Sequence, residues 1–325
     1  MIEVAAAIID NGQGQILIAR RRLGKSQAGM WEFPGGKLER GESVEQCLIR
    51  ELEEEMNIRI EPYEWFGQCE YAYEDAAIRL IAYRARYIAG EIQLTDHDEY
   101  RWVQLEELHE YSFAPADVEF VERLTVKFTL KQAYNQQAAV RDQAQIEAWK
   151  CEERDQVLDV WNREGVHRML EIGAGPGRDS LFFQQQRFQV TAVDLSDAMI
   201  QLCRDKGLDA RVMDFYELNF ADAEFDAVYA MNCLLHVPKA ELHRVLSEIH
   251  RVLKPEGMFF LGLYGGRSTE GIWAQDSYEP KRYFAMYPDE ELVRITETQF
   301  TIEEFHTRFL GEDVPHFQYL MLRKS

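Results

Sequence analysis

The sequence predicts two domains of mixed α and β structure, an α+β domain followed by an α/β domain with a mostly parallel sheet. Its 325 residues are about twice the length of a typical domain, and 46% are hydrophobic, which is enough for two cores. In the second half the apolar runs RMLEIG, QVTAVD, ARVMD, FDAVYAM and GMFFLGLY alternate with amphipathic segments, as in a doubly wound sheet. We expect domains at residues 1–131 and 146–325 and a helical linker at 132–145.

The first domain reads as strands separated by turns, with one helix. Strand-like runs occupy residues 4–84, and Ser43 with Gln46 forms a capping-box pattern that predicts a helix over about 44–56. No Gly or Pro occurs within residues 116–164. Part of that run, KQAYNQQAAVRDQAQIEAW, is rich in Gln and Ala and has little apolar periodicity, so we expect a solvated helical connector.

The charge balance argues against long nucleic acids as partners. Residues 1–140 carry 15 basic and 25 acidic side chains and the remainder 21 and 32, so the two net charges are −10 and −11, which repel polyphosphate backbones. Five cysteines without a CxxC pair argue against a disulfide framework or a structural zinc site. MIEVAAAIID lacks a basic leader, and no apolar run reaches the ~18 residues of a membrane span. We expect a cytoplasmic protein without a membrane partner, and its oligomeric state is not predicted.

The helix at 44–56 sets carboxylates beside apolar side chains. At 100° per residue its apolar stripe includes Glu51 and Glu55, and Glu54 lies at the edge of that stripe. Carboxylates in an apolar face repel one another and lose hydration, which is costly unless a cation compensates them. A Mg²⁺ site resolves the conflict, because Mg²⁺ binds carboxylates together with substrate phosphates. The alternative is a solvated acidic helix surface.

The residues around this helix resemble the Nudix box, G-x5-E-x7-R-E-U-x-E-E-x-G-U, in which U is a bulky aliphatic residue. Six of the seven fixed positions match, and the exception is Asn57, which we expect to adopt the left-handed conformation of the usual glycine. The matching positions are Gly36, Glu42, Arg50, Glu51, Leu52, Glu54, Glu55 and Ile58. The resemblance covers residues 2–130 and implies a Nudix α/β/α sandwich.

Resemblance to that family implies a hydrolase that uses Mg²⁺ or Mn²⁺ to cleave a nucleoside diphosphate linked to another group. The metal-binding positions implied are Gly36, Glu42, Glu51, Glu54 and Glu55. Among them Glu51 and Glu54 are candidate catalytic residues, and Arg50 would orient a glutamate. A further acid from outside the box is usual, and we expect Glu99 in this role, with Asp98 equally near.

The segments MIEVAAAII, QAGMWEFPGGK and FAPAD resemble the MutT-like branch. Its members hydrolyse nucleoside triphosphates to monophosphates and pyrophosphate, including oxidised guanine or cytosine nucleotides. On this resemblance Arg21 would contact a phosphate, Phe33 would lie beside the substrate, and Asp117 would read the base. Asp117 could accept from an exocyclic amine or donate if protonated, so the base is left open. Asp117 could instead cap the following helix, and Phe33 could be a core residue.

A glycine-rich loop follows the strand RMLEIG in the second domain. Gly173, Gly175 and Gly177 are followed by Arg178, where the dinucleotide fingerprint G-x-G-x-x-G needs glycine. The loop therefore favours a ligand that carries an amino acid on a sulfonium over one that carries a pyrophosphate. Glu171 is a candidate partner for the ammonium group of that ligand.

Two later strands of this domain end in acids. Asp194, 21 residues after Gly173, can bind two ribose hydroxyls, and Asp214 can accept from an adenine amine. With FDAVYAMNCLLHV and RVLKPEGMFFLGLY, these motifs resemble class I S-adenosylmethionine-dependent methyltransferases over residues 146–325. The resemblance implies S-adenosylmethionine as cofactor and a Rossmann-like domain with a mostly parallel seven-stranded sheet. The sheet would end in the antiparallel hairpin FTIEEFHTRF and HFQYLMLRK.

The methyl acceptor is expected to be a small molecule. Methyl transfer needs orientation more than acid or base help, so no catalytic dyad is required. His236 could take a proton from the acceptor, or it could be a structural turn residue. The segment from GGRSTEGIW to YEPKRYFAMY is expected to cover the acceptor with Arg267, Trp273, Tyr278, Arg282 and Tyr283.

Together these features predict a bifunctional enzyme that hydrolyses a nucleotide and methylates a small molecule. The alternative is one catalytic domain regulated by another that only senses a nucleotide or S-adenosylmethionine. A methyltransferase for long nucleic acids is disfavoured by the charge of −11 on that half.

Overall fold

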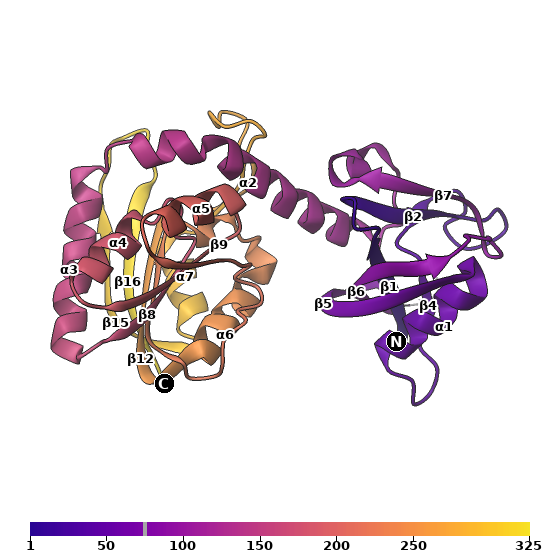
Figure 1. Ribbon diagram of the computed structural model, residues 1–325, viewed down its shortest axis with the longest axis horizontal. Coiled ribbons are helices and arrows are strands. Elements are labelled where there is room, and N and C mark those ends of the chain that lie inside the picture. Colours follow the sequence, from indigo (N-terminus) through magenta and orange to yellow (C-terminus); the bar gives the residue numbers. More distant parts are fainter. Residues whose placement is uncertain (74–76) are drawn as a thin grey trace. The chain divides into compact units, whose positions relative to one another are not determined.

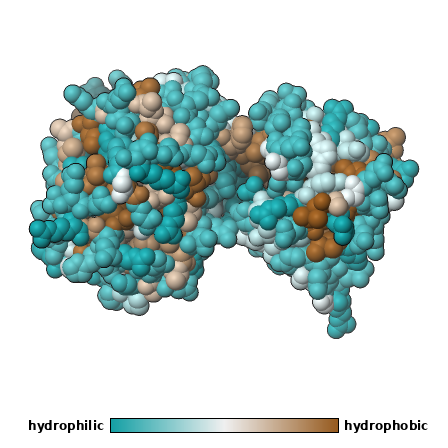
Figure 2. Space-filling model, viewed as in Figure 1, coloured by the Kyte–Doolittle hydropathy of each residue, from teal (hydrophilic) through white to brown (hydrophobic). Residues whose placement is uncertain are grey.

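The computed structural model describes residues 1–73 and 77–325 and divides the chain into two compact units, Met1–Phe128 and Thr129–Ser325 (Figure 1). Within the described ranges, no helix combines the length and the apolar character that a membrane span requires. The molecular face in Figure 2 is mainly hydrophilic, in keeping with the net charge of −21.

Seven strands form the sheet of the first unit, in the order β3-β2-β1-β6-β5, with β4 beside β1 and β7 beside β2. They are β1 (Ile2–Asp10), β2 (Gln15–Arg21), β3 (Trp31–Glu32), β4 (Gly35–Lys37), β5 (Ile58–Ala72), β6 (Ala77–Gly90) and β7 (His97–Gln104). β1 pairs with β6 in parallel, and the other pairs are antiparallel. The helices of this unit are α1 (Val44–Met56), the short η1 (Leu105–Glu110) and the start of α2 (Val118–Gln143).

Alternation along β1 builds a core on each face of this sheet. Ala5 and Ala7 pack with the buried side of α1, whereas Ala6 and Ile8 pack with Phe120 and its neighbours in α2. The sheet is therefore enclosed between two helices, and the predicted α/β/α sandwich is confirmed.

The second unit contains a seven-stranded sheet in the order β10-β9-β8-β11-β12-β16-β15. Its strands are β8 (Arg168–Ile172), β9 (Gln189–Asp194), β10 (Asp209–Val212), β11 (Phe225–Met231), β12 (Leu253–Gly265), β15 (Phe300–Arg308) and β16 (His316–Lys324), and β13 (Thr269–Ile272) with β14 (Tyr283–Met286) forms a separate hairpin. Its helices are α3 (Ala148–Glu164), α4 (Arg178–Gln185), α5 (Asp197–Asp205), η2 (Leu234–His236), η3 (Lys239–Glu241), α6 (Leu242–Val252) and α7 (Asp289–Thr296).

The strands β8 to β12 pair in parallel, and β15 and β16 add the antiparallel hairpin that was expected. The Rossmann-like fold with a mostly parallel seven-stranded sheet is therefore confirmed. Along the chain, β9 and β10 are added on one side of β8, and β11 and β12 are then added on the other side. Such a reversal of strand order opens a crevice at the carboxyl ends of the strands, where ligands bind in folds of this kind.

The segment expected to be a solvated connector is helical as far as Gln143, because α2 continues to that residue. It is not solvated throughout. Ala133 and Ala138 are buried, and the Asn135 carboxamide oxygen accepts from the hydroxyl of Ser196 at 2.6 Å and from a backbone amide of α5. The expectation of solvation is wrong for this face of the helix, since small side chains and an amide pack within the second unit. A linker at 132–145 that is separate from both domains stays a prediction.

Candidate active sites

Helix α1 begins and ends where its sequence predicts. The Ser43 hydroxyl accepts from the Gln46 amide at 3.2 Å, and the Gln46 side chain accepts from the Ser43 amide at 3.0 Å. Asn57 ends the helix in the left-handed conformation with φ of 55°. The substitution of Asn for the usual glycine therefore leaves the helix terminus intact.

The carboxylates of α1 differ in their surroundings. Glu51 and Glu55 are partly buried and line a pocket of about 670 Å³. The Glu54 side chain is 63% exposed and is not among the residues that line this pocket. The helix thus presents two carboxylates to the pocket and a third to solvent beside it.

Arg50 joins two of the acids expected at the site. Its Nε and Nη2 donate to the two carboxylate oxygens of Glu42 at 2.8 and 2.9 Å, and its Nη1 donates to Glu51 Oε1 at 2.8 Å. The hydrogen bonds from Arg50 lower the pKa of Glu42 to about 2. Arg50 therefore holds Glu51 as expected, whereas Glu42 is engaged with Arg50 and does not line the pocket.

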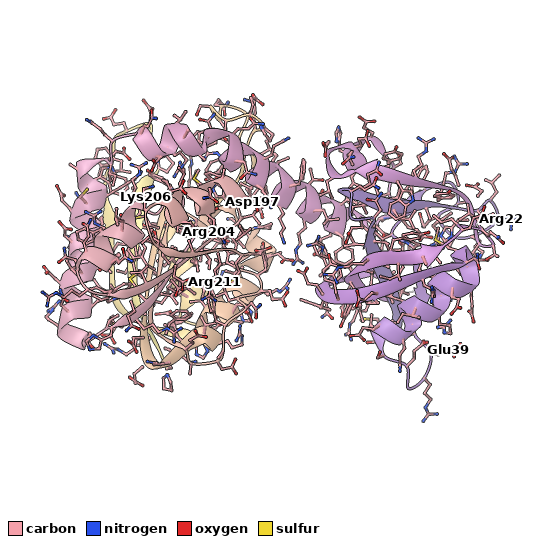
Figure 3. All side chains as sticks on the ribbon, in the orientation of Figure 1. Arg22, Glu39, Asp197, Arg204, Lys206 and Arg211 are labelled. Atoms are coloured by element: carbon pink, nitrogen blue, oxygen red, sulfur yellow. The ribbon has the colours of Figure 1, made fainter. Side chains whose placement is uncertain are left out.

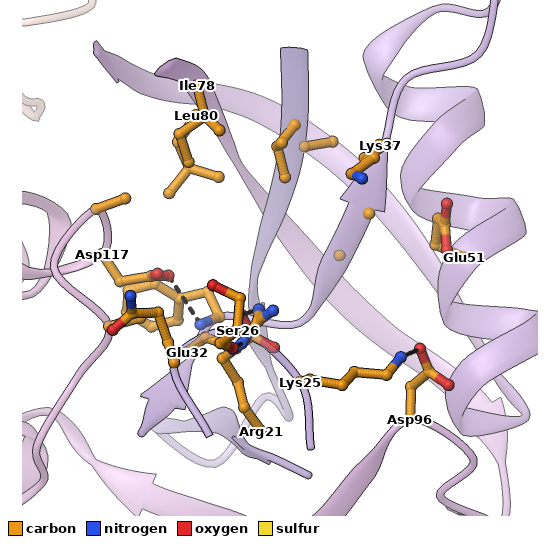
Figure 4. Close-up of a pocket in the computed structure, with 18 of the residues that line it drawn as sticks. Arg21, Lys25, Ser26, Glu32, Lys37, Glu51, Ile78, Leu80, Asp96 and Asp117 are labelled. Atoms are coloured by element: carbon orange, nitrogen blue, oxygen red, sulfur yellow. Dashed lines mark hydrogen bonds and ion pairs between the residues drawn. The ribbon is translucent and has the colours of Figure 1, made fainter. Parts of the chain in front are cut away.

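Basic and acidic side chains share this pocket. Its basic side chains are Arg21, Lys25 and Lys37, and its acids are Glu32, Glu51, Glu55, Asp96 and Asp117. In Figure 4, Glu51 and Asp117 enter from opposite sides, and Lys25 points toward Asp96, with which it forms an ion pair. Arg21 lines the pocket and is held by an ion pair with Glu32, and its contact with a phosphate stays a prediction. Basic side chains can bind the phosphates of a substrate, and the acids can bind cations that accompany those phosphates.

Gly36 lies directly against the carboxyl group of Glu51. A Cβ added at Gly36 would collide with that carboxyl group and would lie 2.5 Å from Glu51 Cγ. Only glycine therefore lets the backbone of β4 approach the helix this closely.

Asp96 and His97 enter the pocket at the start of β7. His97 Nε2 lies 2.8 Å from Glu32 Oε1, and its buried Nδ1, 4.0 Å from Glu55 Oε2, has no hydrogen-bond partner. Burial raises the pKa of Glu55, and the nearby charge of His97 opposes that shift. Glu55 is therefore costly to ionise, and it lies beside the unpartnered Nδ1 of His97. Such a pair indicates a site that is adapted to bind a further charged group.

The acid predicted from outside the box, Glu99, does not reach this pocket. Its carboxylate pairs with Arg20 at 2.8 Å and with Arg101 at 2.6 Å, and Asp98 also pairs with Arg20. The strand register explains this. β7 pairs Arg20 with Glu99 and Arg21 with His97, and an irregularity lies between these two pairs. Residues two apart face the same side of a regular strand, so it is this irregularity that separates His97 from Glu99. Sequence reasoning missed Asp96 and His97, although their nearness to Glu99 in DHDEYRW could have indicated them.

The residues present fit a hard divalent cation. Among the described residues, no three side chains of Asp, Glu, His or Cys are grouped closely enough to hold a metal in this conformation. The pocket nevertheless offers several carboxylate oxygens and a glycine that leaves room for the Glu51 carboxyl. Oxygen ligands of this kind are those that Mg²⁺ and Mn²⁺ prefer.

Asp117 lies at the other end of the pocket, directly before α2. It is 4% exposed, and its Oδ1 accepts from the Phe33 amide at 3.0 Å. Burial, followed by the charge of Glu32, raises its pKa well above the usual range. Phe33 lines the same pocket and also packs on Phe113 in the core, so it is a core residue, and its place beside the substrate stays a prediction.

The glycine-rich loop connects β8 to α4 in the second unit. Gly173, Gly175 and Gly177 have φ values of 65°, 54° and 77°, which side chains rarely adopt. A Cβ at Gly177 would lie 2.7 Å from the Cys203 sulfur, whereas one at Gly175 would meet nothing within 4 Å. A Cβ at Gly173 would likewise collide with Cys233, so the loop is packed at both ends and open at its middle.

The three predicted acids lie within or just after the neighbouring strands β8, β9 and β10, and Asp194 contacts this loop. Asp194, at the end of β9, accepts from the amides of Gly175 and Ser196, both at 2.8 Å, and burial raises its pKa. Asp214 follows β10 and accepts from the Tyr216 amide at 3.1 Å. Glu171 is buried in β8, where it accepts from a serine hydroxyl, and burial raises its pKa.

His236 is engaged through both ring nitrogens. Nδ1 lies 2.7 Å from the Tyr283 carbonyl oxygen, which can only accept, so Nδ1 carries the proton. Nε2 then accepts from the Tyr134 hydroxyl at 2.5 Å. Burial lowers the pKa of His236 to about 3. Neither nitrogen is open to a methyl acceptor, so a proton-accepting role is not carried forward. Tyr134 was missed because it lies in the helix read as a connector.

Comparison with known proteins gives two family matches. Residues 2–124 match the family model of the NUDIX domain, and residues 170–261 match that of a methyltransferase domain. The chain is 40% identical over 122 residues to the CTP pyrophosphohydrolase of Escherichia coli (strain K12), which covers 38% of this chain and 90% of that protein. It is 33% identical over 123 residues to the 8-oxo-dGTP diphosphatase of the same organism, with 38% and 95% covered.

One similar solved structure is the Burkholderia thailandensis 1,6-didemethyltoxoflavin-N1-methyltransferase with bound 1,6-didemethyltoxoflavin and S-adenosylhomocysteine. It is 23% identical, covers 60% of this chain and 87% of its own, and gives a TM-score of 0.48. From the sequence matches and the fold, the chain belongs to the Nudix family through its first unit, and its second unit carries a methyltransferase domain.

Proposed function

We propose that the chain is a bifunctional enzyme. Its first unit hydrolyses a nucleoside triphosphate to a monophosphate and pyrophosphate with Mg²⁺ or Mn²⁺, and its second unit methylates a small-molecule acceptor. The observation that carries the hydrolase half is a single pocket lined by Glu51 and Glu55 of the Nudix box and by the buried Asp117. The names of the relatives, a CTP pyrophosphohydrolase and an 8-oxo-dGTP diphosphatase, support a triphosphate substrate.

The residues that would hold the metal are Glu51, Glu55, Asp96 and the carbonyl group of Gly36, with Glu54 beside them. When bound, the metal supplies positive charge that neutralises phosphate oxygens. Arg50 keeps the Glu51 carboxylate in one orientation through the hydrogen bond at 2.8 Å. Asp96 takes the place that the sequence suggested for Glu99, because Asp96 lines the pocket and Glu99 does not.

In the hydrolysis, a water oxygen forms a bond to a phosphorus atom as the bridging P–O bond breaks, and pyrophosphate leaves with the bonding electrons. Arg21 and Lys25 line the pocket and can donate to the phosphate oxygens. Glu54, the exposed carboxylate of the box, is suited to accept the proton of the attacking water at a carboxylate oxygen.

Asp117 is the proposed contact for the base. As a carboxylate it accepts from an exocyclic amine such as cytosine N4, and as a neutral acid it donates to a carbonyl. The raised pKa of this buried group makes the neutral form accessible. Its hydrogen bond from the Phe33 amide fixes one oxygen of the carboxyl group at the end of the pocket.

In the second unit the proposed cofactor is S-adenosylmethionine, which supplies a methyl group on a positively charged sulfur. Gly175 leaves open space at the loop, and Asp194 is suited to the ribose hydroxyls. Asp214 would accept from the adenine amine, and Glu171 would face the ammonium group. The chain contributes orientation and exclusion of water, which is what an in-line displacement needs.

The test assays the full chain in two reactions: pyrophosphate release from a panel of triphosphates with Mg²⁺, and formation of S-adenosylhomocysteine with pools of small molecules. We expect both activities. The double variant Glu54→Gln, Glu55→Gln should lose only the first, and Asp194→Asn only the second. Loss of both activities in either variant, with folding intact, would contradict the assignment of residues to two separate sites.

A second candidate is a single enzyme regulated by a nucleotide-sensing unit. It is favoured by one observation, that no three ligating side chains among the described residues are grouped for a metal. Tight triphosphate binding without pyrophosphate release at any Mg²⁺ or Mn²⁺ concentration would select this candidate.

A further inference from the structure

In the second unit, five side chains surround Arg141, a cation that forms no ion pair with an acid among the described residues but whose charge partly offsets the rise that burial causes in the pKa of Asp194. These six residues are here called the Arg141 cluster. The cluster comprises Tyr134 and Arg141 of α2, His236 of η2, and Asp276, Tyr278 and Arg282 of the segment that ends in β14. Arg141 Nη1 donates to the Tyr278 hydroxyl at 3.0 Å, and its guanidinium carbon lies 5.4 Å from the ring centre of Tyr134. Its Nε is buried without a hydrogen-bond partner.

The second arginine of the cluster is fully paired. Arg282 Nε and Nη2 donate to the two oxygens of Asp276, both at 2.8 Å, and its Nη1 donates to the Tyr134 hydroxyl at 3.0 Å. Its guanidinium also stacks on the Tyr278 ring at 3.6 Å. Both carboxylate oxygens of Asp276 therefore pair with Arg282, and Asp276 does not neutralise Arg141.

The remaining members of the cluster are neutral. His236 donates from Nδ1 and accepts at Nε2, which requires the uncharged ring. Burial raises the pKa of Tyr134, so its phenol keeps the proton. With one carboxylate and two guanidiniums, the cluster carries a net charge of +1 in a chain whose net charge is −21.

Placing the charge of Arg141 among neutral side chains costs free energy unless an anion pairs with it. A buried charge loses hydration, and phenol oxygens return only part of that energy. Within the described parts of the chain, Arg141 has no ion pair with an acid, although acids outnumber bases by 57 to 36 overall. This combination indicates that the partner of Arg141 is a ligand.

The surroundings of Arg141 place this charge beside the glycine-rich loop. The carbonyl oxygens of Arg141 and Ala144 accept from the side chain of Arg178, the first residue of α4. The next residue, Asp142, pairs with Lys206 at 2.6 Å, and Lys206, labelled in Figure 3, also donates to the Pro176 carbonyl of the loop. The cluster also includes His236 of η2, which follows β11. In the sheet, β11 lies on one side of β8, whereas β9 and β10, which precede the predicted ribose and adenine contacts, lie on the other side.

We propose that the methyl acceptor of the second unit is an acid, a small flat molecule whose carboxylate or similar anionic oxygen group pairs with Arg141. This inference rests on the proposed methyltransferase function and adds the chemical class of the acceptor. A flat aromatic molecule can pack against the rings of Tyr134 and Tyr278, which lie beside Arg141 and meet edge to face at 5.9 Å between centres. The cofactor also has a carboxylate, so the test separates these two sources of negative charge.

The test compares benzoate with benzamide, a matched pair that differs in charge, by titration into the full chain saturated with S-adenosylhomocysteine. We expect benzoate to bind at least about tenfold more tightly, as a charged hydrogen bond predicts. Arg141→Gln should abolish the preference and leave the affinity for S-adenosylhomocysteine unchanged. Arg141→Lys should retain part of it, which excludes misfolding as the cause. Arg294→Gln, which removes an exposed arginine from α7, should retain all of it.

Two results would overturn the proposal. One is equal affinity of the wild-type protein for benzoate and benzamide. The other is a weakening of S-adenosylhomocysteine binding by Arg141→Gln of about tenfold or more, which would assign Arg141 to the carboxylate of the cofactor. A protein that binds no S-adenosylhomocysteine would instead refute the methyltransferase function, and the benzoate preference would then be measured without cofactor.

Discussion

Replacing Gly36 by alanine perturbs the proposed metal site through a single methyl group. The added Cβ would lie 2.5 Å from Glu51 Cγ, whereas ordinary contacts of a Cβ begin at 3.4 Å. The Glu51 side chain must therefore move by about 1 Å, and a displacement of this size costs roughly 100-fold in rate when it misplaces a catalytic group. The backbone of Gly36 is not in the left-handed region, so alanine adds no backbone strain.

The assay measures kcat/KM for pyrophosphate release and the melting temperature of the same preparations. We expect Gly36→Ala to lose activity about 100-fold with little change in melting temperature, because the end of a flexible side chain at the pocket can yield. Glu53→Gln is the matched control, since Glu53 is exposed on the same helix, and it should keep full activity. Activity of Gly36→Ala within about threefold of wild type would refute the reasoning that Glu51 acts from its present position.

Four further predictions follow from the two sites. Tyr134→Phe leaves the buried Nε2 of His236 without a donor and should destabilise the second unit by about 1–3 kcal/mol in urea unfolding, and an unchanged midpoint would contradict the assigned tautomer. The folded pKa of His236, about 3, lies below the usual 6.5, so the unfolded chain binds the proton first as pH falls. Stability should therefore drop between pH 6.5 and 3 by up to about 1.4 kcal/mol per pH unit, and His236→Gln should remove that slope in denaturant titrations. Asp117→Asn should change the ratio of kcat/KM for CTP and 8-oxo-dGTP by about tenfold, since the amide keeps the acceptor for Phe33 but loses the acid; an unchanged ratio would remove Asp117 from base recognition. Chelation by EDTA should stop pyrophosphate release and spare S-adenosylhomocysteine formation, and equal loss of both would count against a metal confined to the first unit.

The local features of the first site could be predicted because they depend on residues close in sequence. The cap at Ser43, the left-handed Asn57 and the position of Glu51 within the apolar stripe all follow from helix geometry and are confirmed. The fold class of each unit could be predicted for the same reason, since strand and helix periodicities are local signals.

The acid outside the Nudix box could not be predicted with the same certainty. Whether Asp96 or Glu99 enters the pocket depends on the register of β7 against β2, and that register contains an irregularity between Arg20 and Arg21. A shift of one residue turns a side chain to the opposite face of a sheet. Sequence distance alone selected Glu99, which does not line the pocket.

Helix α2 illustrates a different limit. Its composition predicted a helix, but Tyr134 and Arg141 contact residues more than a hundred positions away, His236 and Tyr278. Contacts of this range depend on how β11 and the β13–β14 hairpin are arranged, which no local pattern encodes. A Gln- and Ala-rich helix was consequently read as solvated when one of its faces is packed.

The central claim, that the carboxylates of α1 gather around a divalent cation, is tested most directly by anomalous diffraction from crystals of the full chain soaked in Mn²⁺. We expect a manganese peak in contact with Glu51 and Glu55, and we expect the Glu54→Gln, Glu55→Gln variant to lack this peak. The claim would be wrong if crystals soaked in saturating Mn²⁺ showed no peak in that pocket while the same crystals released pyrophosphate from a triphosphate.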